Sequence, residues 1–130
     1  MKTITLAEYL MGRDVAYPSD YTEQIAQNAQ RTVEVINQFL TETGFDGHIN
    51  SGWRPPAINQ ATVGAAQHSK HMLALACDLL DPNGTIDHYC LENSDVLARI
   101  GLWLEDPRST PGWCHLQIVP PASGNRIFLP

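Results

Sequence analysis

Basic residues are scarce in this chain. Only eight of its 130 residues are lysine or arginine, against fourteen acidic residues, and the formal net charge is −6. A protein that binds nucleic acid needs clustered basic side chains to neutralise the phosphates. The composition therefore argues against a nucleic-acid partner.

Paired cysteines and long apolar segments are also lacking. The three cysteines, Cys77, Cys90 and Cys114, are odd in number and form no C-x-x-C pair, so neither a disulfide framework nor a cysteine zinc finger is indicated. No stretch reaches the ~18 apolar residues of a membrane span, and residues 1–11 lack the apolar core of a signal peptide. We therefore expect reduced thiols, no membrane partner and synthesis in the cytoplasm.

The length and the 43% hydrophobic content fit one compact domain over residues 1–130. Hydrophobic spacing and capping signals predict helices over residues 5–12, 20–44 and 85–100, the last with a break near residues 93–94. Strands are predicted over 48–53, 76–80, 113–119 and 127–129, and a long irregular loop over 57–67. Helices and strands that mix without regular alternation indicate an α+β fold.

Three residues of types that commonly bind metals are candidate zinc ligands. A catalytic zinc needs three His, Asp or Glu ligands and one open position for water, and His71, Asp78 and His115 supply such a set. By spacing alone this signal is weak, because five histidines and fourteen acidic residues offer many triplets by chance. Solvated histidines, or histidines satisfied within the core, are the competing interpretation.

The neighbouring cysteines help to choose the ligand type. If residues 76–80 and 113–119 are strands, successive side chains point to alternate faces of the sheet. Cys77 then lies on the other face from Asp78, and Cys114 on the other face from His115. The thiols then face away from the site and belong to the core. A zinc site with cysteine ligands would require the reverse orientation.

Several motifs together carry a resemblance to a known family. They are Ser51-Gly52-Trp53-Arg54-Pro55, Asn59, Val63-Gly64-Ala65-Ala66, Ser69-Lys70-His71-Met72, Ala76-Cys77-Asp78-Leu79 and Trp113-Cys114-His115-Leu116-Gln117. The segment from about residue 48 to residue 119 resembles the zinc D-Ala-D-Ala carboxypeptidases and related phage and bacterial peptidoglycan peptidases. The resemblance implies a hedgehog/D,D-peptidase-like fold, with a small antiparallel sheet flanked by helices.

The same resemblance implies roles for individual residues. His71, Asp78 and His115 would ligate Zn²⁺, while Arg54 and Ser69 would contact a carboxylate or carbonyl of the substrate. A guanidinium suits this task, because it holds a carboxylate through two parallel hydrogen bonds. The competing interpretation of Arg54 is a solvated arginine at the end of a strand.

Two positions depart from the family pattern. Ala74 stands where glycine is usual, a modest change that can be tolerated only if the backbone φ there is negative. Gly112 stands three residues before the final histidine, where many members carry the acid that accepts a proton from the metal-bound water. Glu105 and Asp106, on the segment before the last strand, are the candidate replacements, with solvated loop acids as the alternative.

These observations lead to one main functional hypothesis and two others. The first is zinc-dependent hydrolysis of an amide bond in peptidoglycan stem peptides or cross-links, by an enzyme of the phage-lysin or virion-associated kind that acts on the cell wall. The second is a non-catalytic zinc module that binds the wall or belongs to a virion. The third is a cytoplasmic amidase that acts on small peptides.

Overall fold

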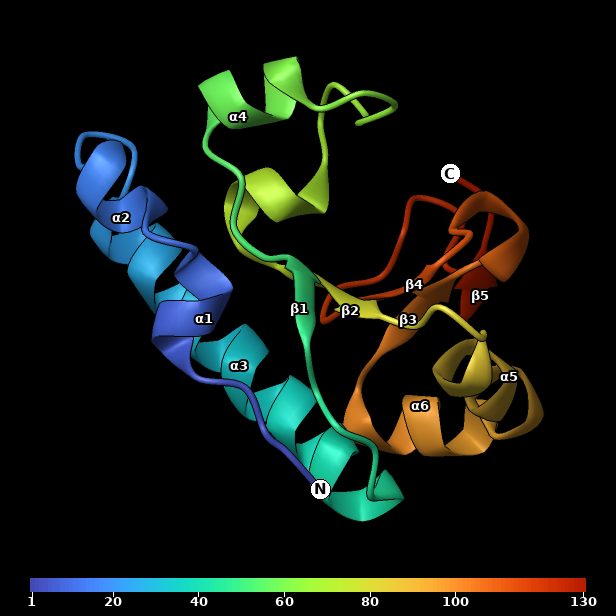
Figure 1. Cartoon of the computed structure of the whole chain (residues 1–130). Coiled ribbons are helices and arrows are strands. Elements are labelled where there is room, and N and C mark those ends of the chain that lie inside the picture. Colours follow the sequence, from blue (N-terminus) through green and yellow to red (C-terminus); the bar gives the residue numbers. More distant parts are fainter.

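The computed structural model describes residues 1–130 and contains one five-stranded sheet with the strand order β1-β2-β4-β3-β5 (Figure 1). The strands are β1 (Ile49–Ser51), β2 (Ala76–Leu80), β3 (Trp103–Glu105), β4 (Trp113–Gln117) and β5 (Ile127–Phe128). The α-helices are α1 (Leu6–Leu10), α2 (Arg13–Ala16), α3 (Glu23–Thr43), α4 (Pro56–Ala61), α5 (Thr85–Glu92) and α6 (Ser94–Ile100). Two 3-10 turns are η1 (Lys70–Leu73) and η2 (Pro107–Ser109). The α+β prediction is confirmed.

Helix α3 is the main support of the sheet. It begins where the Thr22 side chain accepts a hydrogen bond from the Ile25 backbone, and it ends at Gly44, whose φ of 79° continues the chain in the left-handed region. Its buried residues recur every three or four positions and are Ala29, Thr32, Val35, Ile36, Phe39 and Leu40. This face packs against α1, α6 and strand β2.

Strands β2 and β4 form the centre of the sheet. They pair antiparallel over their whole length, with Asp78 directly opposite His115 and Cys77 opposite Leu116. Alternate residues of a strand point to opposite faces of the sheet, so Asp78 and His115 share one face. Cys77 and Cys114 are fully buried in the hydrophobic cluster on the other face, as the alternation predicted.

The sheet departs from the prediction at one edge. Residues 103–105 form β3, which pairs antiparallel with β4 and parallel with β5. The sheet is therefore mixed rather than wholly antiparallel. The parallel pairing arises because the connection over residues 118–126 carries the chain from β4 across to the outer edge of β3. Strand β3 itself was not predicted, because three residues are too few to show an alternation of apolar and polar side chains.

The predicted loop over residues 57–67 is partly helical. Helix α4 occupies Pro56–Ala61, with a proline in its first turn, where the missing N–H removes no hydrogen bond. The loop then continues to η1, and in Figure 1 this part stands at the end of the molecule opposite the C-terminal end of α3. None of the helices combines the length and apolar character that a membrane span requires.

Candidate metal centre

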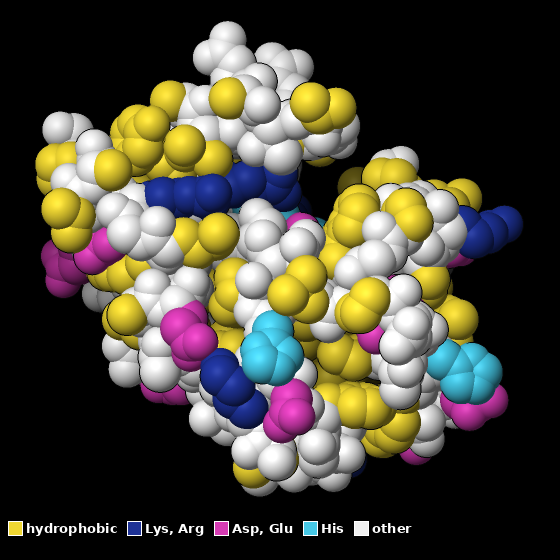
Figure 2. Space-filling view, viewed as in Figure 1, with side chains coloured by type: hydrophobic (Ala, Val, Ile, Leu, Met, Phe, Trp, Pro, Cys, Tyr) yellow, Lys and Arg dark blue, Asp and Glu magenta, His cyan; other side chains and the backbone are white.

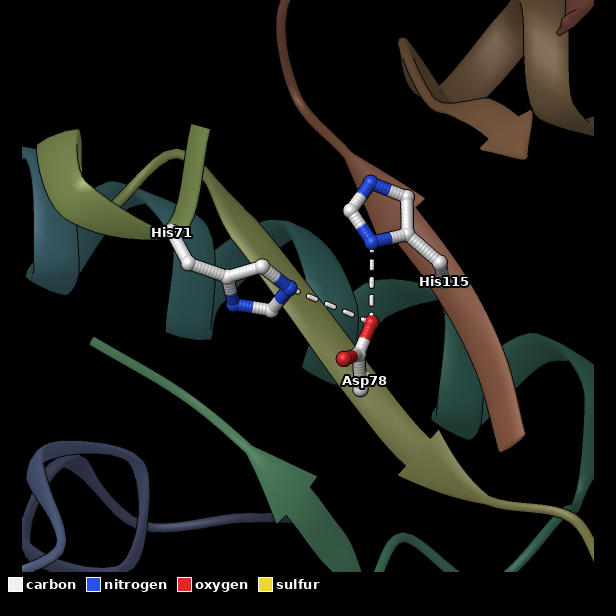
Figure 3. Close-up of side chains that lie close together, drawn as sticks. All are labelled: His71, Asp78 and His115. Atoms are coloured by element: carbon white, nitrogen blue, oxygen red, sulfur yellow. Dashed lines mark hydrogen bonds and ion pairs between the residues drawn. The ribbon is translucent and has the colours of Figure 1, made fainter. Parts of the chain in front are cut away.

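Three predicted ligands converge on one point (Figure 3). His71 comes from η1, Asp78 from β2 and His115 from β4, and all three side chains are buried. The Oδ1 atom of Asp78 lies 3.2 Å from Nε2 of His71 and 2.8 Å from Nδ1 of His115. The three candidate ligand atoms lie within 4.8 Å of one another.

The outer hydrogen bonds of both imidazoles fix which nitrogen faces the centre. Nδ1 of His71 lies 2.8 Å from the Gly52 carbonyl oxygen, which accepts its proton and leaves the lone pair on Nε2. The Gln117 amide nitrogen donates to the Val119 carbonyl, which turns its Oε1 toward His115 at 2.9 Å. Nε2 of His115 therefore donates to Gln117, and its lone pair is on Nδ1.

The centre is therefore built from acceptors. With the imidazoles neutral, both inner nitrogens and the Asp78 carboxylate present lone pairs to the same point, and Nε2 of His71 is buried without a hydrogen-bond partner. Buried acceptors that face one another are unfavourable unless a cation or a shared proton lies between them. Tetrahedral ligands at zinc distances of 2.0–2.2 Å lie about 3.3–3.6 Å apart, so small adjustments fit this set to zinc. The residues present fit the metal.

Burial and the contacts among the three side chains set the direction of each pKa shift. Burial opposes ionisation of Asp78, but the two imidazoles outweigh it and hold the pKa of this carboxyl below its usual range. Burial lowers the pKa of His71. Burial is also the largest single effect on the pKa of His115 and lowers it, but the contributions of Asp78, Gln117 and Glu105 together outweigh burial and raise the pKa.

The centre opens into a cavity of about 420 Å³. The segment from Thr62 to Ala66, which follows α4, lines this cavity together with Ser109 and Trp113. In Figure 2 basic side chains are visible below the lobe at the top of the view, next to a hollow in this face. Arg13 and Arg54 are the basic residues that line the cavity.

The two predicted substrate contacts lie in this cavity. Arg54 is only 8% exposed and takes part in no ion pair, and its Nε atom has no hydrogen-bond partner. Its nearest polar contact is Ser69 Oγ, which lies 3.5 Å from Nη2 and also accepts a hydrogen bond from the His71 backbone. Ser69 thus begins η1 and helps to orient the first ligand. A buried guanidinium left this free is available to an anionic ligand.

Of the two candidate bases, Glu105 lies in the cavity and Asp106 does not. Glu105 ends β3 rather than lying in a loop, and the register that pairs Trp103 with Gln117 brings it opposite His115. Burial raises the pKa of Glu105. The Asp106 carboxylate instead accepts hydrogen bonds from the Arg108 backbone and guanidinium, which lower its pKa to about 2.

The two departures from the family pattern have structural explanations. Gly112 has a φ of 95°, so the turn into β4 requires glycine, and an acidic side chain there would be strained. The expectation that alanine at position 74 requires a negative φ is wrong. Ala74 has a φ of 57° and ends η1 in the left-handed conformation, with its methyl group fully buried. Core packing holds this strained backbone in place.

Two parts of the site were missed from the sequence. Gln117 fixes the tautomer of His115, and its position two residues along the same strand was the signal that could have indicated this. Arg13 reaches the cavity from α2, far from the motifs, and no local pattern marks it.

The comparison with protein families agrees with the site. A family described as Peptidase M15 matches residues 11–94, which include Arg54, Ser69, His71 and Asp78. His115 and Glu105 lie beyond the matched segment, and the sheet brings them to the same centre. Neither the curated proteins nor the solved structures gave a match. The match covers more than half of the chain, and the chain belongs to the Peptidase M15 family of zinc-dependent metallopeptidases.

Proposed function

We propose that this protein hydrolyses an amide bond in the stem peptides or cross-links of bacterial peptidoglycan, with zinc as its cofactor. The observation that carries the proposal is the convergence of three buried acceptor atoms at the floor of a cavity that also holds an unpaired, buried arginine. The resemblance of the motifs to phage and bacterial wall peptidases supports the substrate class. We extend the proposal to a lysin-like or virion-associated enzyme that acts on the cell wall.

The chemistry divides between the metal and the chain. Bound zinc polarises a carbonyl and lowers the pKa of a water molecule to near neutrality. Arg54 holds a carboxylate of the peptide through its free guanidinium edge, and Ser69 lies beside it. These contacts fix the scissile amide relative to His71 and His115. The two imidazoles are themselves held in orientation by their hydrogen bonds to the Gly52 carbonyl and to Gln117.

We assign the role of general base to Glu105. It lines the same cavity as the three ligands and belongs to the strand next to that of His115. Its carboxylate would accept the proton of the attacking water and pass it to the leaving amine. The position that carries the acid in related enzymes is a glycine here, so the acid reaches the cavity from a neighbouring strand.

Zymography in a gel containing bacterial sacculi tests the proposal. We expect clearing that a chelator abolishes and zinc restores, with close to one zinc per chain by mass spectrometry. His71→Ala should lose both the zinc and the clearing. His88→Ala is the matched control, because His88 is exposed and paired with Glu92 on α5, and it should retain both.

Other results of the same experiment would contradict the proposal. Tight binding of zinc and sacculi by a folded protein that clears no wall would favour the non-catalytic module. Hydrolysis of soluble dipeptides without attack on sacculi would favour an amidase that acts on small peptides.

A further inference from the structure

The cavity is lined by two arginines, one more than a single substrate carboxylate requires, together with the acids Asp78 and Glu105. Arg13 and Arg54 both line it, and neither takes part in an ion pair. Of the four arginines outside the cavity, three pair with acids, namely Arg31, Arg99 and Arg108. The fourth, Arg126, stacks on Trp103 and donates to the Leu102 carbonyl. In a chain of net charge −6, two neighbouring arginines without acidic partners are unusual.

The position of Arg13 is built into the fold. Its Nη1 donates to the Trp53 carbonyl at 2.8 Å, directly before Arg54 in the chain. The Trp53 backbone N–H donates in turn to the Tyr9 carbonyl at 3.2 Å, which ties the α1–α2 segment to this loop. Gly52 permits the approach, because a Cβ there would lie 1.9 Å from the Tyr9 carbonyl oxygen.

The two guanidiniums are close enough to influence each other. The charge of Arg13 lowers the pKa of Arg54, in the same direction as the larger effect of burial. Asp78 and Glu105 act on Arg54 in the opposite direction without forming an ion pair with it. Neighbouring like charges that partly lack solvent are stabilised by anionic groups placed between them.

We propose that Arg13 and Arg54 form a two-carboxylate site beside the metal centre, and that Arg13 selects peptides carrying a second free carboxylate. The inference rests on the proposed function and names its substrate class. Acidic stem peptides fit the site, because a γ-linked glutamate or a diaminopimelate residue keeps a free carboxylate in addition to the one at the chain end. Amidation of these side carboxylates removes the group that Arg13 recognises.

The test measures binding rather than cleavage. The probes are the peptide L-Ala-γ-D-Glu-diaminopimelate-D-Ala and the same peptide with its two side carboxylates amidated, both with a free C-terminus. Isothermal titration uses the full chain loaded with zinc and carrying Glu105→Gln to suppress turnover. We expect the free-acid peptide to bind about 10-fold more tightly, which is the contribution of one charged hydrogen-bonded contact.

The variants locate the preference. Adding Arg13→Gln should reduce the difference between the peptides to less than two-fold, with the amidated peptide binding as before. Arg13→Lys keeps the charge without the planar fork and should retain part of the preference. Arg31→Gln, on the outer face of α3, is the matched control and should leave both affinities unchanged.

Three outcomes would overturn the inference. The first is an unchanged preference in a folded Arg13→Gln protein, and the second is equal weakening of both peptides, which would indicate that Arg13 only supports the loop. The third is the absence of any preference in the parent chain. Neither arginine is a candidate metal ligand, and the titration measures binding rather than cleavage. A failure of this inference can therefore be distinguished from a failure of the proposed function in the wall-clearing assay.

Discussion

The two faces of strands β2 and β4 are both buried at the centre of the sheet but differ in chemistry. On one face Cys77, Leu79, Cys114 and Leu116 are fully buried and belong to the hydrophobic cluster. On the other face Asp78, His115 and Gln117 are between 3% and 8% exposed. One backbone thus presents an apolar core to α3 and α5 and a polar centre to the cavity.

The difference shows where the chain places its unfavourable interactions. The apolar face contributes the burial that stabilises the fold. The polar face collects acceptors that oppose one another, a buried arginine without an acidic partner and, at its border, the strained Ala74. Local rules are broken on the functional face, as expected when a site is supported by a well-packed scaffold.

Among the effects that distinguish the polar face from the apolar face, we expect the largest to be a loss of kcat in Glu105→Gln. The amide keeps the shape of the side chain but cannot accept the proton, so kcat on a stem peptide should fall about 10²–10⁴-fold. Zinc content and the unfolding midpoint should stay close to those of the parent. Asp106→Asn is the matched control one residue away and should retain kcat within about two-fold. A Glu105→Gln protein with undiminished kcat would remove Glu105 from the mechanism.

Leu116→Ala should produce the opposite pattern on the apolar face. Removing this fully buried side chain should reduce the free energy of unfolding by about 2–5 kcal/mol, measured by denaturant titration. Zinc stoichiometry and kcat, measured well below the unfolding midpoint, should change little. If zinc is lost in the folded variant, the two faces are coupled more tightly than the alternation implies.

The sequence predicted this division because period-two alternation is readable in five-residue strands. Strand β2 was found with the predicted bounds, and the break near Asn93 separates α5 from α6 as expected. The three ligands came together because the pairing of β2 with β4 places two of them directly opposite each other. The motifs supplied the third, His71.

The parts that were missed depend on long-range contacts. Strand β3 has three residues, and its parallel partner β5 lies more than twenty residues away in the chain. Arg13 enters the cavity because α1 docks beside Gly52, which a linear pattern does not reveal. The conformation of Ala74 was mistaken because core packing, not intrinsic preference, sets its φ.

Asp87→Asn tests whether a buried carboxylate on the apolar side of the sheet, where it has no role in binding, destabilises the fold. Asp87 lies on α5 near Cys114, is 5% exposed, and has one carboxylate oxygen without a partner. Burial raises its pKa to about 6. Because the folded state holds this proton more tightly than the unfolded state, the protein should lose stability as the pH rises from about 4 through 6.

The substitution should therefore be stabilising near neutral pH. We expect Asp87→Asn to gain about 1–2 kcal/mol at pH 7, after allowance for solvent near the group, and almost nothing at pH 4. Denaturant titrations at the two pH values measure the difference. An equal gain at both would show that ionisation of Asp87 is not the cause.

The smallest effect is expected at Ala74, where the backbone strain near the candidate ligand His71 can be compared with an ordinary buried alanine. Ala74→Gly relieves about 1–2 kcal/mol of left-handed strain, but it removes a buried methyl group and makes the unfolded chain more flexible. These contributions oppose each other, so the free energy of unfolding should change by less than about 1 kcal/mol. Ala76→Gly, equally buried on β2 and without a positive φ, lacks the compensating relief and should lose about 1–2 kcal/mol. Equal losses in the two variants would mean that Ala74 is not strained, and that the functional face carries less backbone strain than its φ indicates.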